Sequence, residues 1–385
     1  MNMQTEIGRT DTIIRSFSGQ RQHAHSPFDQ AESVLSQAAL RQLHIERLMG
    51  YGAHHDDAAE LRGRVWAGES WQAVATDLAE KCLHPPELLI SPESKASRAH
   101  RLYRASALIR MSQMMMVDNS TERDEIVARA AKLFEEAAQI TGDCKREVFD
   151  TPDGPLVGWR FPSQTGETFG RVVSIGGIEG WAMDFAEMGL HLAERGLEAV
   201  MLDGPGQGES RTMYKHFLSP TFETAYAAVF DALDRAEPSL PIGFIGNSMG
   251  GSVGMHLARL NKKIAALCNN GGATDPARER PNRTIAQKLA AHVGDVSIEE
   301  SRQVWGLIAP LDTSVSLDCP LLVVHGGLDP LVPLEDAKLM FDSAESRDKH
   351  FVVFDDADHC IYKHADERDA LICDWMLSRL KTVNA

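Results

Sequence analysis

The sequence lacks a disulfide framework, a cysteine motif for a metal and a long apolar run. Its six cysteines are scattered without any C-x-x-C pair, so we predict reduced thiols and no zinc site. No uninterrupted apolar stretch approaches the roughly 20 residues that span a bilayer, and residues 1–9 have neither the basic start nor the apolar core of a signal peptide. We therefore expect a cytoplasmic protein with no metal, no cofactor and no membrane partner.

Basic residues are also scarce relative to acidic ones. The 385 residues include 39 Lys and Arg against 55 Asp and Glu, which gives a formal net charge of -16. An acidic surface repels phosphate backbones and anionic lipids, so nucleic acid is not an expected partner. The length suffices for one large and one smaller unit, and a small-molecule substrate fits best.

The most informative motif that is present is a G-x-S-x-G sequence at residues 246–250. It follows the apolar run 241–245 and precedes the helix-like segment 250–257. This strand, turn and helix context is typical of a nucleophile elbow, in which small flanking residues let the turn close tightly and expose the serine hydroxyl. Ser248 is therefore the predicted nucleophile.

A base and an orienting acid follow downstream, each after a strand-like run. Asp329 lies just beyond the run 320–327, and His359 lies in the loop after the run 350–354. The chain order Ser, Asp, His is that of α/β-hydrolases and differs from the two well-known protease orders. We predict a triad of Ser248, Asp329 and His359, with the aspartates at positions 355, 356 and 358 left open as alternative orienting acids.

The chemistry also needs hydrogen-bond donors for a developing oxyanion. The strand-like run 171–175 leads into the glycine-containing loop 176–181, whose backbone can turn its amides outward. We expect the Ile178 N–H and the Met249 N–H to form the oxyanion hole. A simple tight turn at the two glycines is the alternative.

The chain divides near residue 145 on its periodicity. Residues 1–145 show helical patterns, including two helices at 97–117 and 121–140, and no convincing strand, whereas residues 146–385 alternate strand-like and helix-like segments. We therefore predict a helical amino-terminal cap followed by an α/β domain with a mostly parallel sheet. A mostly helical insertion at about 275–312 is expected to form a lid.

Together with the elbow, the loops at 176–179 and 203–210 and the long helical amino-terminal region resemble one branch of the α/β-hydrolases. This branch includes 2,6-dihydroxypseudooxynicotine hydrolase, fungal pigment hydrolases that shorten polyketides, and fermentation-respiration switch proteins. The resemblance implies that the helical region caps the site and helps to form a homodimer, and that a carbon-carbon bond beside an aryl ketone is cleaved.

The resemblance also implies an acidic residue beyond the strand that follows the nucleophile helix. Glu279 stands at a comparable place and would act as an acid or position the substrate. Taken alone, Glu279 is more simply a surface ion-pair partner of Arg278 or Arg280.

Three functions follow as hypotheses. The leading one is hydrolytic carbon-carbon cleavage of an aryl or polyketide-like ketone. The second is a carboxylesterase or lactonase, which needs the same triad but releases a better leaving group. The third is a non-catalytic ligand-binding protein on the same fold, against which the complete triad argues.

Overall fold

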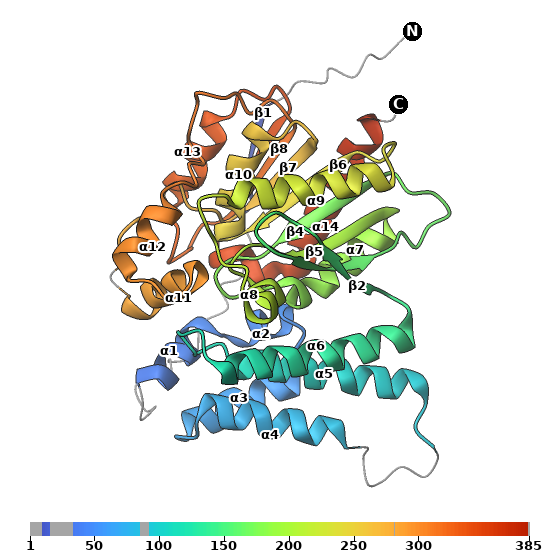
Figure 1. Cartoon of the computed structure of the whole chain (residues 1–385), viewed down its shortest axis with the longest axis vertical. Coiled ribbons are helices and arrows are strands. Elements are labelled where there is room, and N and C mark those ends of the chain that lie inside the picture. Colours follow the sequence, from blue (N-terminus) through green and yellow to red (C-terminus); the bar gives the residue numbers. More distant parts are fainter. Residues whose placement is uncertain (1–9, 16–33, 85–91, 281, 384–385) are drawn as a thin grey trace.

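A nine-stranded sheet forms the centre of the protein (Figure 1). The computed structural model describes residues 10–15, 34–84, 92–280 and 282–383. The strand order is β1-β9-β8-β7-β6-β4-β5-β3-β2; β3 pairs antiparallel with both β2 and β5, and the other pairs are parallel. The strands are β1 (Thr10–Arg15), β2 (Lys145–Phe149), β3 (Leu156–Phe161), β4 (Gly170–Ile175), β5 (Leu197–Asp203), β6 (Ile242–Asn247), β7 (Ile264–Asn270), β8 (Leu321–Gly326) and β9 (Lys349–Phe354).

Helices cover both faces of this sheet, which explains why its central strands are apolar throughout. Every residue of β4, β6 and β8 is buried, as expected for parallel strands packed on both sides. Adjacent residues such as Val172 and Val173 belong to opposite hydrophobic clusters because successive side chains of a strand point to opposite faces. One cluster includes α7 (Ala186–Glu194) and α14 (Ala365–Val383), and the other includes α9 (Phe222–Ala236), α10 (Met249–Leu260) and α13 (Leu334–Ser343).

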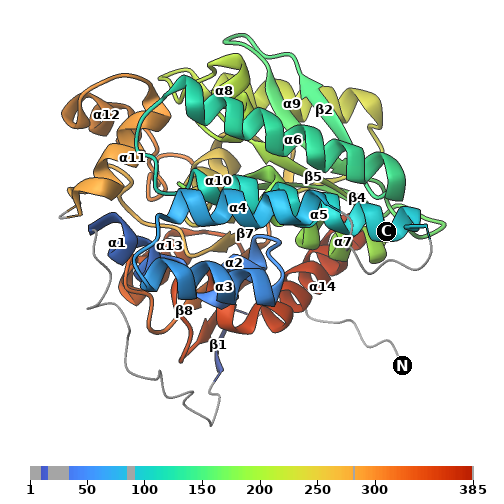
Figure 2. The same ribbon diagram turned by 90° about the horizontal axis from the view of Figure 1, so that it is seen from below.

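The amino-terminal helices form a layer below the sheet in Figure 1, and Figure 2 views this layer from outside. They are α1 (Val34–Gln42), α2 (Ile45–Gly50), α3 (His55–Trp66), α4 (Trp71–Leu83), α5 (Lys95–Ser112) and α6 (Thr121–Thr141). Their buried side chains share one cluster with α7 and α14. A buried ion pair between Arg110 of α5 and Asp184, at 2.7 Å, also joins the cap to the sheet domain.

The predicted boundary falls where the last cap helix ends. Gly142 caps α6 in the left-handed conformation, with φ 77°, and β2 begins at Lys145, since glycine adopts this conformation at little cost. The prediction that no strand precedes this boundary is wrong, because β1 pairs with β9 at the edge of the sheet. The predicted helix at 97–117 ends earlier, at Ser112, where the Trp71 indole N–H donates to the carbonyl of Met111 at 2.8 Å.

The segment predicted as a lid contains α11 (Arg283–Val293) and α12 (Ile298–Trp305), which lie beside the carboxyl ends of the strands (Figure 1). The short elements are η2 (Ala182–Phe185), α8 (Gly208–Tyr214) and η3 (His359–His364). No helix in the described parts of the chain combines the length and apolarity needed to cross a bilayer.

Candidate active site

Ser248 occupies a strained turn between β6 and α10. Its φ of 57° and ψ of -126° are unfavourable for a residue with a side chain. The turn is held by a hydrogen bond from the Ser248 N–H to the Asn270 carbonyl at 2.8 Å. A Cβ at Gly246 would lie 2.1 Å from the Gly250 oxygen, so the flanking glycine is a steric requirement. The local geometry is that of the nucleophile elbow predicted from the motif.

The structure brings Ser248, His359 and Asp329 into one hydrogen-bonded chain. The distance from His359 Nε2 to Ser248 Oγ is 2.8 Å, and that from His359 Nδ1 to Asp329 Oδ2 is 2.7 Å. Asp329 Oδ1 accepts further hydrogen bonds from the backbone N–H groups of Leu331 at 2.8 Å and Val332 at 3.0 Å. The three side chains come from separate loops, at the carboxyl ends of β6, β8 and β9.

The charges in this chain favour ionised Asp329 and a basic His359. Burial opposes ionisation of Asp329, but His359 and the two backbone N–H donors outweigh it and lower the pKa of the carboxyl. Burial likewise disfavours the imidazolium, but neighbouring Cys360 and the Asp329 carboxylate outweigh it and raise the pKa of His359 above 6.5. The carboxylate therefore orients the imidazole and stabilises its protonated form.

The other candidate groups at this rim form contacts of their own, although His325 Nε2 also lies 3.9 Å from Asp329 Oδ2. His325 is fully buried and donates from Nε2 to the Val332 carbonyl at 3.0 Å. Of the alternative acids, Asp356 pairs with His364 and Asp358 pairs with His44. In the described parts of the chain, no group of three or more His, Cys, Asp and Glu side chains is arranged to hold a metal ion.

The loop after β4 approaches the nucleophile closely. A Cβ at Gly177 would lie 2.7 Å from the Ser248 Cβ, so this contact requires glycine. The Gln207 side-chain amide donates to the carbonyls of Gly176 at 2.8 Å and Gly177 at 2.9 Å. The glycine-rich loop after β5 thus supports the predicted oxyanion loop, a role that the sequence motif did not reveal.

A cavity of about 420 Å³ opens onto the nucleophile. Ser248, His359, Ile178 and Met249 all line it, and so do residues of α1, α2 and α11. The two residues whose backbone amides are predicted as oxyanion donors therefore line the same cavity as Ser248. Residues of the cap, the lid segment and loops of the sheet domain form the rest of the wall.

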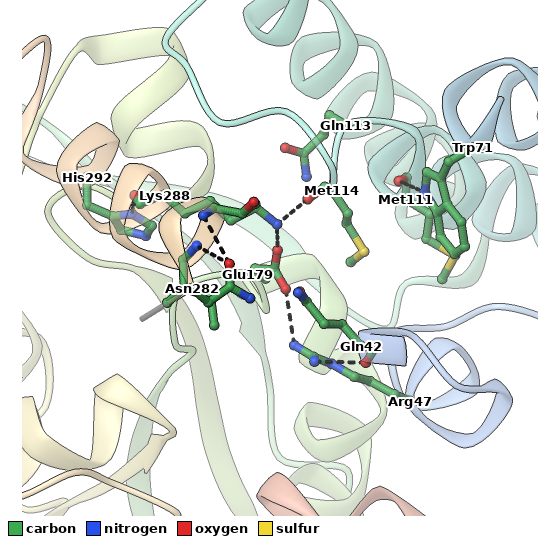
Figure 3. Close-up of polar contacts among 12 residues, drawn as sticks. Gln42, Arg47, Trp71, Met111, Gln113, Met114, Glu179, Asn282, Lys288 and His292 are labelled. Atoms are coloured by element: carbon green, nitrogen blue, oxygen red, sulfur yellow. Dashed lines mark hydrogen bonds and ion pairs between the residues drawn. The ribbon is translucent and has the colours of Figure 1, made fainter. Parts of the chain in front are cut away.

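Glu179, next to Ile178, is the meeting point of three segments that are distant in sequence (Figure 3). Its Oε1 accepts from Lys288 Nζ of α11, and its Oε2 lies 3.4 Å from Arg47 Nη2 of α2. Lys288 Nζ also donates to the Met114 carbonyl, just beyond α5, at 2.5 Å. The side chains of Lys288, Glu179 and Arg47 are only 4%, 11% and 13% exposed. This ion-pair network fixes the loop that carries Ile178 to both the cap and α11.

Glu279 does not join the site. It lies exposed on the turn before α11, and it is absent from the described residues that line the cavity, whereas its neighbour Arg280 lines it. The irregular turn directs the adjacent side chain toward the cavity instead, and the role of Glu279 as an acid stays a prediction. Sequence reasoning missed Glu179, Lys288, Arg47 and Arg280, and only Glu179 carried a signal, its position beside Ile178.

Comparisons with known proteins agree with this fold. The serine aminopeptidase S33 family matches residues 166–305, and the prolyl oligopeptidase family matches residues 239–382. The crystal structure of 2,6-dihydroxy-pseudo-oxynicotine hydrolase superposes with a TM-score of 0.74 at 23% identity, covering 87% of this chain and 95% of that one. Fold and site together define the protein as a hydrolase with the α/β-hydrolase fold.

Two proteins of known name are similar to this chain in sequence. The chain is similar to 2,6-dihydropseudooxynicotine hydrolase of Paenarthrobacter nicotinovorans, with 25% identity over 340 residues that cover 86% of this chain and 90% of the relative. It is also similar to monoacylglycerol lipase of Mycolicibacterium smegmatis, with 24% identity over 232 residues that cover 49% of this chain and 83% of the relative. The first similarity includes the cap, and the second extends over about half of the chain.

Proposed function

We propose that this protein is a serine hydrolase that cleaves a carbon-carbon bond beside the carbonyl of an aryl or polyketide-like ketone. The observation that carries the proposal is the hydrogen-bonded chain of Ser248, His359 and Asp329 at the base of a capped cavity. The preference for carbon-carbon cleavage rests on similarity to 2,6-dihydropseudooxynicotine hydrolase, which extends over the cap as well as the sheet domain.

In the first half of the proposed reaction, His359 takes the proton of the Ser248 hydroxyl while its oxygen attacks the substrate carbonyl. The backbone N–H groups of Ile178 and Met249 stabilise the resulting oxyanion. Collapse of this intermediate breaks the carbon-carbon bond, and the imidazolium returns the proton to the departing carbon. The electron pair leaves with that carbon, so an adjacent ring or second carbonyl that delocalises it speeds the step.

In the second half, water hydrolyses the acyl-enzyme. His359 removes a proton from the water, whose oxygen attacks the acyl carbon, and then protonates Ser248 as the carboxylic acid leaves. Asp329 stays ionised throughout and stabilises the imidazolium in both halves.

Ester hydrolysis is the second candidate function, because the chain is also similar to monoacylglycerol lipase over about half of its length. An alkoxide leaves more readily than a carbanion, so the same site needs no electron-delocalising leaving group. The hydrogen-bonded relay argues against the third hypothesis of a non-catalytic binding protein. The homodimer and the cytoplasmic location expected from the sequence stay predictions.

The test compares benzoylacetone, an aryl 1,3-diketone, with 4-nitrophenyl acetate on the purified protein and on Ser248→Ala. Release of benzoate and acetone from the diketone, lost in the variant, supports carbon-carbon hydrolysis. Turnover of the ester alone favours the esterase. Absence of turnover together with absence of Ser248 labelling by a fluorophosphonate contradicts the serine-hydrolase proposal.

A further inference from the structure

The lining of the active-site cavity is basic although the protein is acidic. Arg41, Arg47, Arg280 and Lys288 contribute cationic side chains, and Glu179 is the one carboxylate that lines the cavity among the described residues. The protein as a whole carries a formal net charge of -16. The excess of cationic side chains in the cavity of an acidic protein therefore needs an explanation in the cavity itself.

Glu179 accounts for only part of this positive charge. Its single carboxylate is shared by Lys288 and Arg47, so it can balance only one of the two cations. Burial lowers the pKa of Lys288 to about 7. The ordinary structural role of the network, holding the oxyanion loop, explains these two cations. It does not explain the arginines that line the same cavity without contacting Glu179.

Arg280 is a cavity-lining cation that forms no salt bridge with the described residues. It lines the cavity half-buried, and its buried Nε has no hydrogen-bond partner among the described residues. Neighbouring Arg278 instead pairs with Asp336 at 2.9 Å. Burial and the charge of Arg278 lower the pKa of Arg280, and the carboxylates of Asp275 and Asp336 offset this only in part. An anion in the cavity would raise this pKa further. A buried donor of this kind costs free energy unless a ligand satisfies it.

We infer that the substrate is an anion: a carbonyl compound that carries a carboxylate, which Arg280 binds within the cavity that contains Ser248. The planar guanidinium donates paired hydrogen bonds that match the two oxygens of a carboxylate. Arg41, which also lines the cavity, adds an attractive field, which is strengthened in a cleft with low-dielectric walls. This inference rests on the proposed function and specifies its substrate class.

The experiment measures how well two aryl ketones inhibit hydrolysis of neutral 4-nitrophenyl acetate. 3-Benzoylpropionate carries a carboxylate, and 3-benzoylpropionamide is its uncharged isostere. The inhibition constant of the acid should be at least about tenfold lower than that of the amide, the contribution of one charge-assisted hydrogen bond. Arg280→Gln should bring the two constants within about threefold of each other.

Arg283→Gln is the matched control. Arg283 is exposed at the start of α11, does not line the cavity and loses the same charge. It should retain the preference for the acid, which separates a local contact from the effect of net charge. Equal inhibition by the two ketones in the unaltered protein, or an undiminished preference in Arg280→Gln, overturns the inference.

Failure of the proposed function gives a different result. A protein that neither hydrolyses the ester nor reacts with a fluorophosphonate at Ser248 is not a serine hydrolase. The two ketones can still be compared by calorimetry on that protein. Tighter binding of the acid that depends on Arg280 then supports the anionic ligand, and equal binding overturns it.

Discussion

Replacing Glu179 by Gln removes the carboxylate that Lys288 and Arg47 share. Both cations are largely buried, with 4% and 13% of their side chains exposed, so neither regains full hydration. At the 3.4 Å separation of Arg47 and Glu179, the attraction is about 5 kcal/mol at an effective dielectric constant near 20. Desolvation cancels part of this, and leaving buried charges unpaired costs about 3–5 kcal/mol. We therefore expect the free energy of unfolding to fall by about 3–5 kcal/mol.

The same substitution should slow catalysis, because Ile178 precedes Glu179 on the loop that faces Ser248. A displaced oxyanion donor lowers kcat by roughly 10- to 100-fold. Urea denaturation followed by tryptophan fluorescence gives the stability, and hydrolysis of 4-nitrophenyl acetate gives kcat. Glu194→Gln is the control, because Glu194 lies exposed on α7 without an ion pair among the described residues.

A double variant tests the physical reason for the loss. Glu179→Gln combined with Lys288→Met also removes the ammonium that the first substitution leaves buried and unpaired. We expect this protein to be at least about 1 kcal/mol more stable than Glu179→Gln alone. A loss below about 1 kcal/mol for Glu179→Gln, or simple additivity of the two substitutions, would refute the reasoning.

Four further predictions concern the elbow and the relay, the last with a comparison at Gly63 of α3. Ser248→Ala should lower kcat by on the order of 10⁴- to 10⁶-fold and abolish fluorophosphonate labelling, and residual labelling would contradict its role. Because the base must be neutral, the raised pKa of His359 predicts that kcat/KM increases with pH through an apparent pKa above 6.5. Asp329→Asn should shift this increase in kcat/KM to lower pH and reduce kcat about 10⁴-fold. The stabilisation from this pair should be full below pH 6.5 and disappear as pH rises through the folded-state pKa of His359, which urea denaturation across pH can check. Gly246→Ala should destabilise the protein by several kcal/mol because its Cβ would lie 2.1 Å from a backbone oxygen, whereas Gly63→Ala, with no atom within 4 Å of its Cβ, should stabilise α3 by roughly 0.5–1 kcal/mol.

Much of the fold could be predicted because its signals are local. Alternating strand-like and helix-like segments after residue 145 predict a parallel sheet covered by helices. In the structure, the parallel strands β4 to β9 do alternate with helices along the chain. The missed strand, β1, contributes one pairing to the edge of the sheet. Its partner β9 lies more than 300 residues away in sequence, and a six-residue segment carries too little pattern to reveal such a pairing.

The wall of the cavity could not be predicted because it is assembled from distant segments. Arg47, Glu179 and Lys288 come from the cap, the loop after β4 and the lid segment. No spacing in the sequence relates them. The turn before α11 is also irregular, so no periodicity indicates that Arg280 rather than Glu279 lines the cavity.

The sequence by itself determined the elbow at Ser248 and the order in which Asp329 and His359 follow. Turn stereochemistry depends on neighbouring residues, and parallel strands bring their carboxyl ends to one edge. Only the tertiary structure decided which charged side chains line the cavity beside Ser248, because the docking of cap and lid onto the sheet sets those contacts. The catalytic chemistry is thus encoded locally, whereas the preference for a substrate is encoded in long-range packing.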